Sequence, residues 1–170
     1  QPQLMVAGPG TVEVRHPELS QFTLHAEGDP ALLFCDNETN VGRVFGSPSP
    51  YPLPRGGEGR VRGAYYKDAF HDYVVRGDRS AVNPEQTGTK AAAHYTLEIP
   101  GGGNATVRLR LVSREAKNAF GGFDKTFKSR IADADEFYDR ITPKSLNEDQ
   151  RRVHRQALAG MLWSKQYYYF

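Results

Sequence analysis

Apolar residues recur about every two residues in the first part of the chain and about every 3.6 residues in the last part. This change of period constrains the fold more than any other feature. Val12 and Val14 alternate with charged residues, and residues 31–35 form a short, continuous apolar run. Alternation gives a strand one buried and one solvated face, as in an antiparallel sheet. The predicted strands cover residues 12–15, 22–25, 31–35, 93–99 and 107–111. The first two thirds of the chain are therefore predicted to form an antiparallel β-sandwich.

The clearest predicted element is a hairpin of the last two strands. Odd-numbered positions are apolar in both 93–99 and 107–111, and the glycine-rich segment 100–104 suits the turn between them. Two longer stretches predict loops: alternating prolines exclude helix and central strand from residues 46–63, and residues 76–90 are polar. Loops of this length are either functional or surface connections, and the sequence leaves both readings open.

The last third of the chain predicts two helices. Phe127, Ile131, Ala134, Tyr138 and Ile141 are spaced by four, three, four and three residues, which is typical of one helix face. The stretch from Ser145 to Glu148 reads as a capping box, so a second helix should begin at about Asn147. We therefore predict an α+β fold, with an antiparallel β-sandwich over residues 1–122 and two C-terminal helices over 123–170.

Composition excludes several classes of function. The chain has 22 basic and 20 acidic residues, which gives a net charge of +2. It contains no run of basic residues of the kind that binds a phosphate backbone, so nucleic-acid binding is not favoured. The apolar run at 31–35 is too short to span a membrane. The single cysteine, Cys35, excludes an intrachain disulfide, and the five histidines lack metal-ligand spacing. We expect no metal and no cofactor, and a cytoplasmic location, with the periplasm as the alternative.

Two polar clusters are candidate binding residues. The first is the cluster of hydrogen-bonding side chains Asn37, Glu38, Thr39 and Asn40 after the apolar strand, which could hold sugar hydroxyls or simply form a turn. Asp72 and Tyr73 lie in the aromatic and acidic stretch 65–75, which suits either a carbohydrate site or a half-buried strand. No spacing among the acidic residues identifies a catalytic carboxylate pair, and no nucleophile motif occurs.

Several segments, in order, resemble mannosylglycerate-hydrolase-like bacterial glycoside hydrolases, which are related to family 63 glucosidases. The resemblance covers about residues 12–170. The segments that carry it are LFCDNETN at 33–40, DAFHDYVV at 68–75, NP at 83–84, GTKAAAHY at 88–95, ADEFY at 134–138 and RQALAGMLWSKQYYY at 155–169.

The resemblance implies a fold and an activity for a longer protein. Family members are several times longer, with an N-terminal β-sandwich, linker helices and an (α/α)6 barrel that hydrolyses α-glycosidic bonds with inversion. An inverting enzyme needs a carboxylic acid and a carboxylate base, which in this family lie in the barrel. The resemblance therefore implies an interior piece that contains no catalytic residue and is inactive alone. It braces the barrel and helps shape its sugar pocket.

The resemblance also implies candidate pocket residues and partners. It places Trp163, Gln166 and Tyr167 on the first barrel helix, where they could contact an α-glucoside-like carbohydrate. The other partners it implies are the remaining sandwich strands and the barrel. Two alternatives stay open: a self-standing carbohydrate-binding module, or a structural domain without a ligand. The sandwich edges and the aromatic segment 167–170 also predict a homodimer of this chain.

Overall fold

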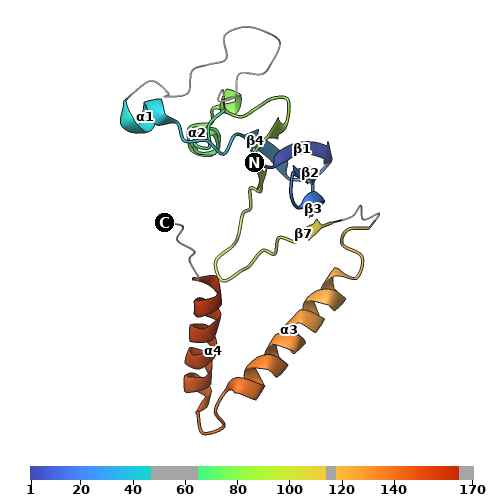
Figure 1. Ribbon diagram of the computed structural model, residues 1–170, viewed down its shortest axis with the longest axis vertical. Helices are drawn as coiled ribbons and strands as arrows, with labels where there is room; N and C mark the ends of the chain where they lie inside the picture. Colours follow the sequence, from blue (N-terminus) through green and yellow to red (C-terminus); the bar gives the residue numbers. More distant parts are fainter. Residues whose placement is uncertain (47–64, 114–117, 165–170) are drawn as a thin grey trace. The chain divides into compact units, whose positions relative to one another are not determined.

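The computed structural model describes residues 1–46, 65–113 and 118–164. The chain divides into two compact units, Gln1–Phe120 and Gly121–Phe170. The first contains the strands and two short helices, and the second contains two long helices (Figure 1). The loop predicted over 46–63 lies outside the described residues, apart from Gly46.

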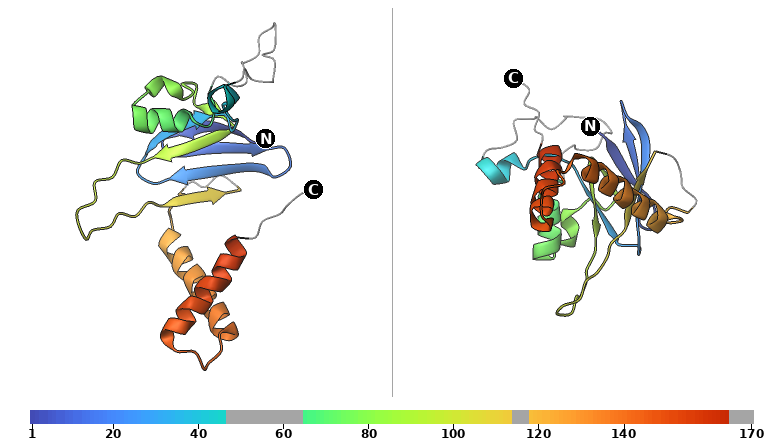
Figure 2. Two further views of the ribbon diagram at one scale, coloured as in Figure 1. Left: turned by 90° about the vertical axis from the view of Figure 1, so that its left-hand side faces the viewer. Right: turned by 90° about the horizontal axis from the view of Figure 1, so that it is seen from below.

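The first unit contains two antiparallel sheets, which confirms the predicted fold class. The larger sheet has the strand order β5-β1-β2-β3-β7 (Figure 2). Its strands are β1 (Gln3–Gly8), β2 (Thr11–His16), β3 (Ser20–Ala26), β5 (Thr87–Gly88) and β7 (Leu109–Val112). The smaller sheet pairs β4 (Ala31–Cys35) with β6 (Lys90–His94).

Strand β4 supplies the centre of the core. Leu33, Phe34 and Cys35 are all buried, because the strand is covered on both faces. Leu33 and Cys35 pack with Ala69 of helix α2 (Ala69–Arg76) and with Val82, which follows the short 3-10 helix η1 (Arg79–Ala81). Phe34 points to the opposite face by strand alternation and is completely buried. The apolar run in the sequence therefore marks the core.

The predicted hairpin between residues 93–99 and 107–111 is wrong. Strand β6 pairs with β4 and β7 pairs with β3, so the two strands belong to different sheets. Glu27 forms hydrogen bonds with a residue next to each of these strands. Its carbonyl accepts from the Tyr95 hydroxyl at 2.7 Å, and its amide donates to the Arg108 carbonyl at 3.1 Å. Pairing with strands far away in the sequence thus replaces the local ladder. The turn itself is present, since the Gly103 amide donates to the Pro100 carbonyl at 2.9 Å.

As a result, the apolar positions of the predicted hairpin are not buried. The exposed fractions are 50% for Leu97, 51% for Ile99, 39% for Val107, 50% for Leu109 and 61% for Leu111. These residues occupy alternate positions, as residues on one face of a strand do. Of the five, only Leu109 and Leu111 lie in a paired strand, β7, which pairs with β3.

Stretch 65–75 contains a helix, so its interpretation as a half-buried strand is wrong. Helix α2 begins after Asp68 and ends at Gly77, whose φ of 72° closes the helix. Phe70 and Tyr73, three residues apart, pack against the core on one helix face. A further short helix, α1 (Val41–Phe45), follows β4, and the polar stretch 76–90 contains η1 and β5.

The second unit consists of α3 (Phe123–Ile141) and α4 (Glu148–Trp163), which confirms the two predicted helices. The cap of α4 differs from the prediction. Asn147, not Ser145, is the N-cap: its side chain accepts from the Gln150 amide at 2.9 Å, and the Gln150 side chain accepts from the Asn147 amide at 3.0 Å. The capping box therefore lies two residues later, because Asn147 adopts the extended backbone that a cap requires.

Candidate functional site

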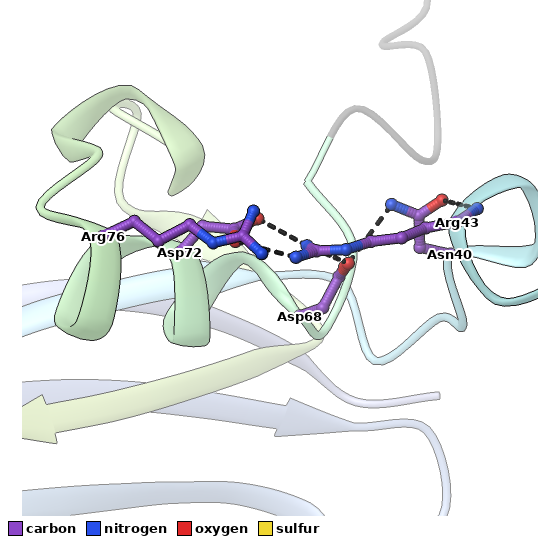
Figure 3. A network of polar contacts seen from close by, with 5 residues as sticks. All are labelled: Asn40, Arg43, Asp68, Asp72 and Arg76. Atoms are coloured by element: carbon purple, nitrogen blue, oxygen red, sulfur yellow. Dashed lines mark hydrogen bonds and ion pairs between the residues drawn. The ribbon is translucent and has the colours of Figure 1, made fainter.

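Arg43 is the centre of a polar network in the first unit (Figure 3). Asn40 caps α1 by accepting a hydrogen bond from the Arg43 amide at 3.1 Å. This cap directs α1 so that the Arg43 guanidinium reaches the start of α2. There it donates to Asp68 Oδ2 at 2.8 Å, and to both oxygens of Asp72 at 2.7 and 3.1 Å. A two-pronged arginine–carboxylate contact fixes geometry as well as charge.

Two further contacts complete the Arg43 network. The Asn40 side-chain amide donates to Asp68 at 3.3 Å, and Arg76 lies 3.2 Å from Asp72, one helical turn further along α2. The network therefore fastens α1 to α2, which lie on the two sides of residues 47–64 in the sequence. A backbone hydrogen bond from Lys67 to Glu38 at 3.1 Å joins the same two segments.

Electrostatics decide what the network can do chemically. Hydrogen bonding from Arg43 holds the pKa of Asp72 below its ordinary value. In return, hydrogen bonds to Asp72 and Asp68 raise the pKa of Arg43. Asp72 is therefore ionised at neutral pH with its oxygens already occupied, and it is unsuited to donate a proton as a general acid. The arrangement stabilises the α1–α2 contact and leaves little acceptor capacity for a sugar hydroxyl.

We predict that Arg43→Gln releases α1 from α2. The variant loses the contacts to both carboxylates and leaves Asp72 with Arg76 only. Amide exchange of Gly46, which donates to Gly42 at the end of α1, should accelerate in an NMR exchange measurement. Arg76→Gln is the matched control, because it removes one 3.2 Å contact of a side chain that is 60% exposed. Equal acceleration in both variants would contradict the central role of Arg43.

The same contact should be sensitive to acid. The pKa of Asp72 is lower in the folded chain than the value of about 3.9 in an unfolded chain. The stabilisation that ionised Asp72 gives to the α1–α2 contact is therefore complete above the unfolded pKa. It is lost as the pH falls through the folded pKa. We therefore expect α1 to stay attached at pH 7 and to detach only below about pH 4. Chemical shifts of α1 amides across an acid titration test this, and a transition near pH 6 would contradict it.

The structure distributes the other predicted binding residues among separate partners. The Asn37 amide donates to Thr89 Oγ1 at 2.7 Å, and its side chain is exposed. The Glu38 carboxylate accepts from Gln1 at 2.8 Å. Both residues precede Asn40, so they lie beside the Arg43 network without belonging to it.

Tyr73 has its ring and its hydroxyl engaged. The Arg79 guanidinium carbon lies 4.7 Å from the ring centroid, and Arg79 also donates to the Tyr73 hydroxyl. His94 meets the ring edge-on at 5.9 Å between centroids. Arg79 therefore occupies one face of the Tyr73 ring on which a sugar ring could otherwise stack.

The remaining predicted residues belong to the second unit. Trp163 is the last residue of α4 and is 91% exposed. Gln166 and Tyr167 lie outside the described residues. The structure thus gives Trp163 the exposure a pocket residue needs and gives no information on the other two.

Sequence reasoning missed Arg43, and it did not single out Asn40 and Asp68 from the two polar stretches that contain them. A signal for Asp68 exists, since Asp68, Asp72 and Arg76 have the four-residue spacing of one helix face. That spacing becomes informative only once 69–76 is known to be helical. Arg43 has no comparable local signal, because its partners lie 25 and 29 residues away.

Cys35 is a core residue without a nucleophilic role. Burial raises the pKa of its thiol to about 11, so the thiolate is scarce at neutral pH. We predict that the native chain reacts with a disulfide reagent such as DTNB at least 100-fold more slowly than the urea-unfolded chain. Stopped-flow absorbance measures both rates. Comparable rates would show that the thiol is accessible in the native state.

Three further features concern residues 1–46, 65–113 and 118–164: metal ligands, membrane spans and cavities. No group of three or more potential metal ligands occurs within the described residues. In the same part of the chain, no helix has the length and apolar character needed to cross a bilayer. A hollow of about 190 Å³ lies between α3 and α4. Its three arginines, Arg151, Arg152 and Arg155, each form an ion pair with a carboxylate, so they are poorly suited to bind an anion.

Comparison with known proteins gives one informative match. No family model and no solved structure matches the chain. A Saccharomyces cerevisiae protein, named uncharacterized protein YMR196W, is 39% identical over 153 residues. The match covers 84% of this chain, which spans only 13% of the length of that relative. The similarity is therefore to a small part of a much longer protein.

Proposed function

We propose that this chain is the non-catalytic β-sandwich and linker portion of an inverting, glucosidase-like α-glycosidase. In that longer protein it braces a catalytic barrel and shapes the sugar pocket. The sequence resemblance to mannosylglycerate-hydrolase-like enzymes suggests the activity. The match to 13% of a longer yeast protein fits a chain that works as part of a larger whole.

One observation carries the proposal. Helix α4 ends in Met161, Leu162 and Trp163, whose exposed fractions are 73%, 71% and 91%. Consecutive large apolar side chains at this exposure are typical of a surface that another domain covers. The end of α4 is where the resemblance expects the barrel to begin, so a catalytic domain is the partner that we propose.

The polar network of the first unit supports a non-catalytic role. An inverting glycosidase needs a protonated carboxyl group as general acid and a free carboxylate as general base, about 6.5–9.5 Å apart. Arg43 lowers the pKa of Asp72 and engages Asp68 as well. These two carboxylates therefore suit an anchoring role better than either catalytic task.

The test compares this chain with the longer protein that would contain it. We expect no hydrolysis of α-glucosides by the chain alone, and hydrolysis by the longer protein with the β-anomer as first product in an NMR time course. Turnover by the isolated chain, or retention of configuration, would overturn the proposal.

A variant pair tests the contribution of α4. In the longer protein, Trp163→Ala should raise KM or lower kcat/KM. The reason is that the indole ring is proposed to contact the sugar pocket, or a barrel helix that lines that pocket. Val153→Ala, on the same helix but 60% exposed near its other end, should leave both constants unchanged. Equal effects of the two substitutions would argue against a role for the Trp163 end.

A further inference from the structure

Helix α4 contacts the charged flank of α3 and one residue of its apolar stripe, Tyr138. Arg155 bonds Asp135 at 2.6 Å, Arg151 bonds Asp139 at 3.3 Å, and the Arg155 guanidinium lies 4.7 Å from the Tyr138 ring centroid. These contacts lie in the half of each helix nearest the turn. Beyond it the two helices diverge (Figures 1 and 2). Their interaction is therefore mainly polar and local.

Apart from Ala134 and Tyr138, which are partly buried, the apolar stripe of α3 is exposed. At 100° per residue, the stripe lies about a quarter turn away from the flank that carries Asp135 and Asp139. Along the stripe, Phe127 is 59% exposed, Ile131 48% and Ile141 44%. Such a continuous apolar stripe is the usual seam of a helix–helix contact.

The charges of α3 specify the direction of a partner helix. Residues 123–132 contain three basic and one acidic residue, a net charge of +2, whereas 133–141 contain four acidic and one basic residue, a net charge of −3. A second copy of α3 running parallel would place like charges together. An antiparallel copy places each basic half against an acidic half, which favours this orientation.

The stripe also has a register that fits its own antiparallel copy. Its spacing of four, three, four and three residues is a heptad seam, in which core positions of antiparallel helices alternate. Ile131 then faces Ala134 of the second copy, and Phe127 faces Tyr138 of the second copy. The small Ala134 side chain allows the helices to approach closely near the two-fold axis.

We infer that α3 is a dimerisation helix, which docks antiparallel against the α3 of a second copy of this chain. The inference goes beyond the proposed function and does not rest on it, because the Trp163 end of α4 stays available to another domain. A single helix of 19 residues is about 28 Å long. The interface is therefore small, and the dimer should form reversibly with concentration.

Sedimentation equilibrium of the 170-residue chain tests the dimer. The average mass should rise from 19.0 kDa toward about twice that value with increasing concentration. Ile131→Glu should weaken association at least tenfold, because it buries a charge in the seam. Ser129→Glu is the matched control: it introduces the same charge at an exposed position that lies nearly opposite the stripe. Circular dichroism verifies that both variants keep their helices.

Two outcomes would overturn the inference. A mass of 19.0 kDa at all concentrations would mean that another part of the protein covers the stripe or that it stays exposed. Equal weakening by both glutamates would place the interface elsewhere.

Cysteine cross-linking tests the orientation. Ala134→Cys lies near the proposed two-fold axis and should form a disulfide-linked dimer on mild oxidation, whereas Phe127→Cys should not. The native Cys35 is buried and contributes little background. Cross-linking at both positions would indicate parallel helices and would contradict the antiparallel register.

Discussion

Replacing Phe34 by alanine should lower the free energy of unfolding of the first unit by about 3–5 kcal/mol. Phe34 is completely buried in β4, between Leu33 and Cys35, which are themselves 4% and 1% exposed. Truncation removes a ring from a position without solvent access and leaves a cavity that the two sheets cannot close freely. Urea unfolding followed by far-ultraviolet circular dichroism measures the change.

Phe45→Ala provides the control for this core substitution. Phe45 lies at the end of α1 and is 70% exposed, so its truncation should change the free energy of unfolding by only about 0.5 kcal/mol. A loss below about 1 kcal/mol for Phe34→Ala would show that β4 is not the centre of the core.

Replacing Gly10 by alanine should cost about 3 kcal/mol of unfolding free energy, from strain and crowding together. Gly10 joins β1 to β2 with a φ of 56°, which an alanine side chain disfavours. A Cβ at this position would also lie 2.4 Å from the Ala26 carbonyl oxygen. That oxygen is backbone, so relief requires separating Gly10 from Ala26, whose amide donates to the Gly10 carbonyl at 2.7 Å.

Gly28→Ala separates the two contributions. Gly28 has a φ of 80°, but no described atom outside its own neighbourhood lies within 4 Å of the added Cβ. It should show the conformational strain alone, about 1 kcal/mol in the same urea experiment. Equal losses for the two alanines would mean that the close approach at Ala26 contributes nothing.

The local pattern predicted the elements whose period is unambiguous. Val12 and Val14 lie in β2, residues 31–35 are β4, and the stripe from Phe127 to Ile141 belongs to α3. Side-chain direction in a strand or helix is fixed by backbone geometry, so apolar spacing alone reveals these elements. The same logic could not distinguish a short helix from a strand in 65–75, where aromatic and β-branched residues fit either.

The candidate site could be predicted only in part. Asp72 was recognised as a polar residue in an unusual stretch, but its partner Arg43 lies 29 residues earlier. An arginine on a five-residue helix carries no periodic signal. Its role depends on the Asn40 cap, which is local, and on the placement of α2, which arises from tertiary packing.

The sequence by itself therefore determined the strands β2, β3 and β4 and the helices α3 and α4, because burial on one face leaves a periodic trace in neighbouring residues. Only the tertiary structure decided which strands pair. The apolar pattern of 93–99 and 107–111 fits a local hairpin equally well. The pairing of β6 with β4 and of β7 with β3 places these strands in different sheets. Glu27 lies between them: its carbonyl accepts a hydrogen bond from the Tyr95 hydroxyl, and its amide donates one to the Arg108 carbonyl. Such contacts join residues 68 and 81 positions apart, so no short-range pattern contains them.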